Sequence, residues 1–374
     1  MKHFNVLIGI AISMVLSTVD AHAQLNLPRG SQQASVSQTV GITKIQIDYS
    51  RPSVKGREIW GKLVPYGMNN LGFGTAKESP WRAGADENTV IHFSNDVTVE
   101  GQPLKAGDYG LHMIINDNNK ATIIFSNNSK AWGSFFYNPD EDALRVDVTT
   151  NAIPFTEQLT YEFIDVMPNS ATAVLNWEKK QIPFKIGVDV NKVVLEDIKN
   201  KLQNQEGFNR QTWENAAVYV LNNGGDYKEA ESWIDNAIGG HFYSQKTFNN
   251  LAIKAQLERQ QGNTQAYAKI MDEAMEIATE AQLNALGYQM LNAKNYESAL
   301  KYFKQATIVS PKSPNAFDSL GEYYATVGDK ENAIKNFKKA LSMNPPANVK
   351  LNSEKYLKQL GAMQKHQFKL RIVR

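Results

Sequence analysis

The sequence of 374 residues contains no cysteine. This absence excludes disulfide bonds, zinc sites built from thiolates and a lipid-anchored cysteine after a signal segment. An excess of one charge is also missing, because 40 lysines and arginines balance 38 aspartates and glutamates to a formal net charge of +2. Such a chain builds no strong field for polyanions, so we do not expect nucleic acid as a partner.

After residue 23 the sequence has no apolar run of the roughly 20 residues that a membrane span requires. Residues 1–23 resemble a signal peptide, with a basic start, the apolar run VLIGIAISMVLSTV and the small-x-small motif Ala21-His22-Ala23. We expect cleavage after Ala23 and a mature protein that is periplasmic in a bacterium or secreted. The alternative is an uncleaved anchor helix.

Residues 24–188 are predicted to form an antiparallel β-sandwich or jelly-roll-like domain. Their apolar residues mostly alternate, as in Ile45, Ile47 and Tyr49, which is typical of half-buried strands. Eight or nine short strands without helical crossovers favour antiparallel pairing. Residues 171–179 and 182–188 are predicted as two of these strands, separated by a turn.

The apolar period becomes helical after Gly187, and residues 189–206 are predicted as a connecting helix. Two later segments superpose with a shift of 34 residues. The coincident pairs are Leu286 with Leu320, Gly287 with Gly321, Ala299 with Ala333, Phe303 with Phe337, Ala306 with Ala340 and Pro311 with Pro345. This pattern resembles the tetratricopeptide repeat, in which small residues let paired helices approach and an aromatic ring fills the gap to the next pair.

Two degenerate copies precede these segments, so the sequence predicts four tetratricopeptide-like helical pairs over residues 207–348. A capping helix and a basic tail are expected over residues 349–374, because terminal repeats need a more polar outer face. The predicted fold class is therefore an antiparallel β-sandwich followed by an all-α solenoid.

The first half also resembles a known family. The segments DYSRPSVKGREIWGKLVPYG, WRAGADENTVIHFSNDVTVEGQPLKAGDYGLHM, WGSFFYN and LNWEKKQIPF are similar to the exported family called domain of unknown function 2911. The insertion MNNLGFGTAKESP before Trp81 is longer than expected in that family. The resemblance implies a β-rich exported domain and supplies no activity.

Residues 79–89, SPWRAGADENT, are the main candidate site in this half. One interpretation is a structural turn in which Arg82 pairs with the carboxylate of Asp86, Glu87 or Asp48. The other is a ligand site, in which planar guanidinium groups capture an anionic or sugar-like molecule. The arginines and tyrosines expected to converge there are Arg51, Arg57, Arg82, Tyr49 and Tyr66.

Two histidines, His92 and His112, complete the candidate ligand set, which is Tyr49, Arg51, Arg57, Arg82, Asp86, Glu87, His92 and His112. If their strands pair, the two imidazoles are expected side by side, where Asp108 or Glu100 would help them hold a metal. No HxH or HExxH spacing supports this alternative, so no metal site is assigned.

No nucleophile elbow, Walker loop or dinucleotide fingerprint is present, so we assign no catalytic residue and no cofactor. The sequence is interpreted as an exported, non-enzymatic binding or scaffold protein. The alternative is an extracytoplasmic hydrolase or small-ligand receptor that uses the polar cluster from Trp81 to Glu87.

The tetratricopeptide resemblance implies a concave groove lined by the inner helix of each pair. Carried onto this sequence, the groove positions with polar side chains are Asn284, Tyr288, Asn292, Asn315, Asp318 and Glu322. Amide, phenol and carboxylate groups on one curved face suit an extended protein or peptide partner. The alternative is a solenoid that only buttresses the β domain.

Overall fold

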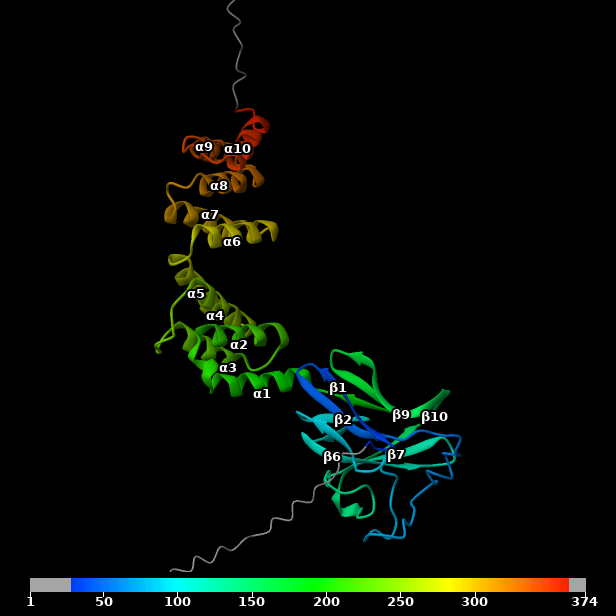
Figure 1. Ribbon diagram of the computed structural model, residues 1–374. Helices are drawn as coiled ribbons and strands as arrows, with labels where there is room; N and C mark the ends of the chain where they lie inside the picture. The colour runs from blue at the N-terminus through cyan, green and yellow to red at the C-terminus, as the bar shows by residue number, and fades with distance from the viewer. Residues whose placement is uncertain (1–27, 363–374) are drawn as a thin grey trace, which may run out of the picture. The chain divides into compact units, whose positions relative to one another are not determined.

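The computed structural model describes residues 28–362, so the predicted signal peptide and basic tail lie outside the described residues. The chain divides between Val193 and Val194 into two compact units, a β unit and a helical unit (Figure 1). No helix within residues 28–362 is both long and apolar enough to cross a membrane.

The β unit is an antiparallel β-sandwich, as the sequence predicted. Its larger sheet contains, in spatial order, β1 (Gln32–Val40), β2 (Thr43–Arg51), β3 (Thr89–Phe93), β6 (Gly107–Ile115), β7 (Lys120–Ser126) and β8 (Asp142–Thr149). The smaller sheet contains β5 (Gln102–Leu104), β4 (Val97–Val99), β10 (Ser170–Gly187) and β9 (Asn151–Met167). Every pairing between neighbouring strands is antiparallel.

The core lies between the two sheets, because alternate residues of each strand point inward. Ile45 pairs with Phe93 across β2 and β3, and both side chains are fully buried. Phe125 of the larger sheet meets Phe184 of the smaller one, with ring centroids 6.0 Å apart. Burying each such ring contributes roughly 1.5–3 kcal/mol to folding, so these contacts hold the sheets together.

One strand prediction is wrong. Residues 171–179 and 182–188 are not two strands divided by a turn, because residues 171–187 belong to the single strand β10, and only Val188 lies beyond its end. The polar residues between them lie where its pairing with β9 shifts register, on both sides of Glu178, which has a φ of 53°. Such bulges absorb a break in apolar alternation without ending the strand.

The helical unit begins within α1 (Val190–Leu202), because the boundary between the two units falls inside this helix. Consecutive helices then pack in pairs (Figure 1). The pairs are α2 (Arg210–Asn223) with α3 (Tyr227–Ile238), α4 (Phe248–Gln260) with α5 (Thr264–Glu276), α6 (Glu280–Asn292) with α7 (Tyr296–Val309), and α8 (Pro314–Thr326) with α9 (Lys330–Leu341). A last helix, α10 (Ala347–Gln359), packs on α8 and α9.

Polar caps set where these helices begin. The side chains of Asp226, Asn295 and Asp329 accept hydrogen bonds from backbone N–H groups in the first turns of α3, α7 and α9. Thr247 and Thr279 form capping boxes at α4 and α6. Each cap satisfies an N–H group that the helix itself leaves unpaired, so the sequence fixes the starts of these helices locally.

Candidate functional site

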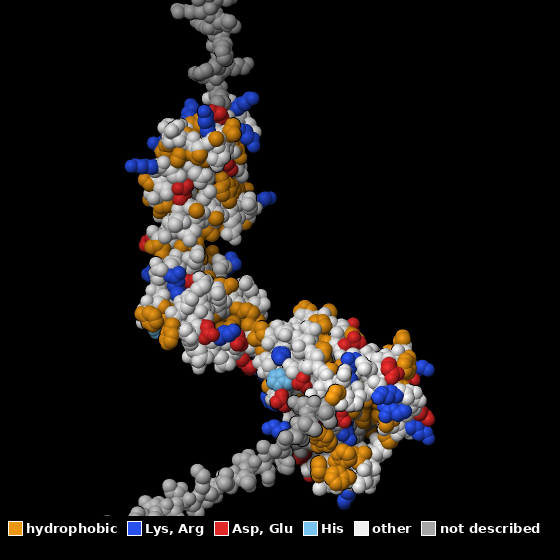
Figure 2. Space-filling model, viewed as in Figure 1, with side chains coloured by type: hydrophobic (Ala, Val, Ile, Leu, Met, Phe, Trp, Pro, Cys, Tyr) orange, Lys and Arg blue, Asp and Glu red, His pale blue; other side chains and the backbone are white. Residues whose placement is uncertain are grey.

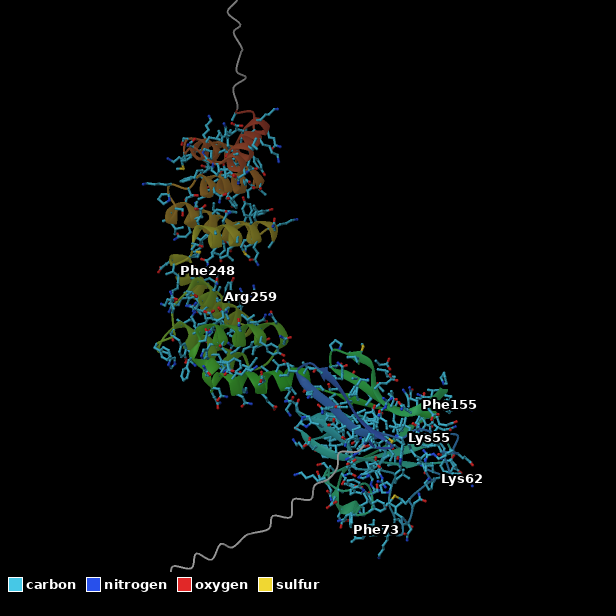
Figure 3. The ribbon with its side chains drawn as sticks, viewed as in Figure 1. Lys55, Lys62, Phe73, Phe155, Phe248 and Arg259 are labelled. Atoms are coloured by element: carbon cyan, nitrogen blue, oxygen red, sulfur yellow. The ribbon has the colours of Figure 1, made fainter. Side chains whose placement is uncertain are left out.

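The long connection between β2 and β3 encloses a cavity of about 540 Å³, called here the β-unit cavity. Its charged lining residues are Lys55, Arg57, Arg82 and Asp86. Its apolar lining includes Leu63, Val64, Leu71, Trp81, Trp177 and the prolines at 52, 65 and 80. Lys55, labelled in Figure 3, lies near the start of this connection. The volume is within the range of small-molecule sites in proteins.

Trp81 is both part of a well-made turn and part of the cavity wall. Its backbone N–H donates to the carbonyl of Met113 at 2.9 Å, and the Met113 N–H donates back at 2.8 Å. The indole N–H donates to the carbonyl of Gly84 at 3.2 Å. The ring stacks on Trp177, with centroids 5.9 Å apart and planes 16° from parallel. The turn therefore fixes one aromatic wall of the cavity.

Arg82 does not make the predicted ion pair within the part of the chain that the structure describes. Its Nη1 donates to the backbone carbonyl of Asp86 at 2.6 Å, and its guanidinium lies 5.0 Å from the centroid of the Phe135 ring. The carboxylate of Glu87 instead accepts from Arg29 at 2.6 Å. Burial lowers the pKa of Arg82, although the charge of Asp86 opposes this. Arg82 is thus a partly desolvated cation at the cavity wall.

The predicted arginines and tyrosines do not converge. Arg51 donates to the carbonyl of Leu159 at 3.0 Å and to Oγ1 of Thr160 at 2.7 Å, so it ties β2 to β9. The hydroxyl of Tyr49 accepts from the backbone N–H of Tyr161 at 3.1 Å within the core. Of the candidate ligand set, only Arg57, Arg82 and Asp86 line the β-unit cavity, while Tyr49 and Glu87 line a separate hollow.

The predicted side-by-side arrangement of His92 and His112 is wrong. Strands β3 and β6 do pair, but their register places His92 opposite Asp108, whose carboxylate lies 2.6 Å from the ring Nδ1 of His92. His112 lies four residues further along β6, which is about 13 Å at the rise of a strand. Within residues 28–362 no three potential ligands among histidine and acidic side chains gather in a metal-binding cluster.

His112 is packed inside the β unit and does not take part in a metal-binding cluster among the described residues. It is 2% exposed, its Nδ1 lies 3.0 Å from Oγ of Ser134, and its ring meets Tyr137 edge to face. Burial, assisted by the positive charge of Arg82, lowers its pKa from 6.5 to about 4. The imidazole is therefore neutral at physiological pH.

Several cavity residues were missed from the sequence. Trp177 belongs to β10 and looks like an ordinary core residue there, while Lys55 and Leu71 lie in a segment without periodicity. No sequence signal joins these positions, because the cavity forms only when β10 and the β2–β3 connection come together.

In the helical unit, the predicted groove residues fall on the inner helices α6 and α8. Asn292 is exposed, and Oδ1 of Asn284 is buried without a hydrogen-bond partner among the described residues. Asn315 donates to Glu280 at 3.1 Å. Tyr288 lies within hydrogen-bonding reach of Glu322, and burial raises the pKa of Tyr288 well above its ordinary value.

Asp318 of α8 accepts hydrogen bonds from α10 rather than being open to a partner. Nδ2 of Asn352 donates to its carboxylate at 2.7 Å, and Oγ of Ser353 donates to the second oxygen. Asn352 also donates to Glu322. Burial raises the pKa of both carboxyl groups, although these hydrogen bonds oppose it. The 34-residue step from Asn284 to Asp318 extends to Asn352. The repeat period in the sequence could therefore have identified Asn352 as the equivalent position in the next repeat.

Comparison with known proteins agrees with this architecture. Residues 31–186 match the family described as Protein of unknown function (DUF2911), and residues 314–346 match the tetratricopeptide repeat. The chain thus has an N-terminal DUF2911 region followed by C-terminal tetratricopeptide repeats. A curated relative, Superkiller protein 3 of Schizosaccharomyces pombe, is 43% identical over 61 residues, which are 16% of this chain and 4% of that protein.

Among solved structures, the tetratricopeptide protein YrrB is 17% identical, over 44% of this chain and 84% of that one, with a TM-score of 0.27. MamA is 17% identical, over 45% of this chain and 92% of that one, with a TM-score of 0.27. The C-terminal part of a repeat-containing protein from Cytophaga hutchinsonii is 17% identical, over 45% of this chain and 69% of that one, with a TM-score of 0.29.

Proposed function

We propose that this chain, with its DUF2911 region and its tetratricopeptide repeats, is an exported, non-enzymatic scaffold whose repeats bind protein or peptide partners. In this proposal residues 1–23 are a cleaved signal peptide, residues 24–188 form the β domain and residues 189–206 the connecting helix. Residues 207–348 carry the four helical pairs, and residues 349–374 the cap and tail. The mature protein is periplasmic or secreted, has no membrane span and does not bind nucleic acid.

The observation that carries the proposal is the repeated polar strip on the inner helices. The strip consists of Asn284, Asp318 and Asn352 at one repeat position and of Tyr288, Glu322 and Tyr356 at another. The two ends of this strip differ in how their polar side chains are hydrogen-bonded. Toward α10, carboxylates are bound by Asn352, whereas on α6 Asn292 is exposed and the buried carbonyl of Asn284 has no hydrogen-bond partner among the described residues. Amides spaced along inner helices suit the backbone of an extended peptide, which has both donors and acceptors.

Affinity capture with the mature chain tests this function. The variant Asn284→Ala/Asn292→Ala removes both asparagine side chains of α6 and leaves the packed Tyr288 in place. We expect it to lose a defined set of partners from a periplasmic extract. The matched control is Lys304→Ala/Lys338→Ala, which changes two exposed positions of the outer helices α7 and α9 at the same 34-residue spacing. Equal recovery of every partner by the amide variant and the wild type would refute the groove.

A further inference from the structure

The lining of the β-unit cavity has an excess of positive charge. Three cations, Lys55, Arg57 and Arg82, face it together with one carboxylate, that of Asp86. The whole chain is nearly neutral, so this local excess is a property of the cavity and not of the composition. Low-dielectric walls strengthen the field that such a group of charges makes inside a concave site.

Arg82, at the cavity wall, has hydrogen-bond donors that the described residues do not use. The single hydrogen bond found for the Arg82 guanidinium within the described residues goes to the Asp86 carbonyl, and no carboxylate lies within ion-pair distance of it. A guanidinium has five N–H donors, so most of them are unused. Buried donors of this kind favour a bound acceptor, because leaving them unpaired costs free energy.

The remaining wall is flat and apolar. The half-buried indole of Trp81, stacked on the buried indole of Trp177, forms one surface, and Leu63 and Leu71 lie among the other lining residues. Exposed rings continue this apolar character on the same connection. Phe73 is 70% exposed and contacts Phe135 and Phe136. Figure 2 shows hydrophobic side chains gathered at the end of the β unit where Figure 3 labels Phe73. Stacked indoles pack best against a flat hydrophobic body.

We propose that the β-unit cavity binds a small organic carboxylate with a flat apolar body. The carboxylate lies against the donors of Arg82 and Lys55, and the body lies against the indole of Trp81. A planar guanidinium matches a carboxylate through two parallel hydrogen bonds, which gives the site its geometric preference. This ligand site is independent of the partner-binding function proposed for the repeats, so either can fail without the other.

Titration of the full mature chain with 2-naphthoate tests the proposal, with 2-naphthalenemethanol as a neutral probe of the same body. We expect 2-naphthoate to bind at one site, quench tryptophan fluorescence and bind at least about tenfold more tightly than the alcohol, since a charge-assisted hydrogen bond is worth about 1.5–3 kcal/mol. Absence of saturable binding, or equal affinity for the two probes, would overturn the proposal. Tighter binding of 2-naphthyl phosphate than of 2-naphthoate would overturn its carboxylate assignment.

Two variants test where 2-naphthoate binds. Lys55→Gln changes an exposed side chain and should weaken 2-naphthoate binding about two- to fivefold, because an exposed charge contributes little. Arg82→Gln should weaken it about tenfold or more.

The matched control is Lys62→Gln, an exposed lysine on the same connection but outside the cavity (Figure 3). It should bind 2-naphthoate as the wild type does. Because Arg82→Gln alters a packed residue, Lys55→Gln is the deciding variant if Arg82→Gln fails to fold. Unchanged 2-naphthoate affinity in Lys55→Gln would show that the probe binds elsewhere and would overturn the assignment.

Discussion

A ring carbon of Phe303 lies 2.6 Å from the point that a Cβ atom on Gly287 would occupy. The same relationship recurs one repeat later, where Phe337 lies 2.8 Å from the corresponding point on Gly321. Both phenylalanines are fully buried. Glycine is therefore required by the close approach of the ring, since both glycines lie in the middle of a helix where glycine is otherwise unfavourable.

Gly287→Ala should destabilise the helical unit by about 1–3 kcal/mol, because the added methyl overpacks the Phe303 ring by more than helix propensity gains. Urea unfolding measures the change. Gln289→Ala, at an exposed position of the same helix, should stay within about 0.5 kcal/mol of the wild type. The double variant Gly287→Ala/Phe303→Leu should show coupling between the two sites, and strict additivity would contradict the packing argument.

His112 should make the β unit sensitive to acid. Its pKa of about 4 in the folded protein is below its ordinary 6.5, so the unfolded chain takes up a proton that the folded chain does not. The stability that this neutral imidazole confers is complete above pH 6.5 and is lost as the pH falls toward 4, by up to roughly 3 kcal/mol. Hydrogen exchange of β6 and β7, followed by mass spectrometry, reports this loss for the β unit alone.

His112→Gln should flatten that pH profile, whereas His92→Gln, which changes a partly exposed histidine, should keep it. An unaltered acid profile in His112→Gln would assign the sensitivity to other groups.

Asp318 should give the helical unit the opposite pH dependence from His112, so that its contribution to stability falls as the pH rises. Burial raises its folded pKa above the ordinary carboxyl value, so the folded state binds a proton more readily than the unfolded state. Its contribution to stability is therefore complete below the ordinary pKa and is lost as the pH rises through the folded value. Hydrogen exchange of α8 and α10 should be measured at several pH values. On acidification, the protection of these amides should increase less in Asp318→Asn than in the wild type.

Removing the side chain tests the hydrogen bonds themselves. Asp318→Ala leaves the donors of Asn352 and Ser353 unpaired, and it should cost about 1–3 kcal/mol at neutral pH. Denaturant unfolding monitored in the helical unit gives the value. A variant as stable as the wild type would show that the contact between α8 and α10 does not depend on this carboxylate.

Export predicts a defined mature end. If the signal peptide is cleaved after Ala23, the purified protein should begin at Gln24. Intact-mass measurement of the protein recovered from the periplasm or medium provides the check. An intact N-terminal segment in a membrane fraction would support the anchor-helix alternative instead.

Local pattern was sufficient for much of the fold. Alternation placed Ile45 and Ile47 on the buried face of β2, and the 34-residue period paired Gly287 with Gly321 and Phe303 with Phe337. Periodicity failed at β10, because the polar residues around Glu178 are accommodated by bulges and not by a turn. It also failed for His92 and His112, because the pairing register, which a single strand does not contain, sets which side chains are neighbours.

The sequence by itself determined that a β-sandwich precedes a helical repeat array, since each strand and helix has its own apolar period. Only the tertiary structure decided that Lys55, Arg82 and Trp177 enclose one cavity, because these residues are brought together by strand pairing and sheet packing across 122 positions of the chain. Likewise, only helix packing decided that Asp318 is bound by Asn352, since the period gives equivalent positions but not which of them touch.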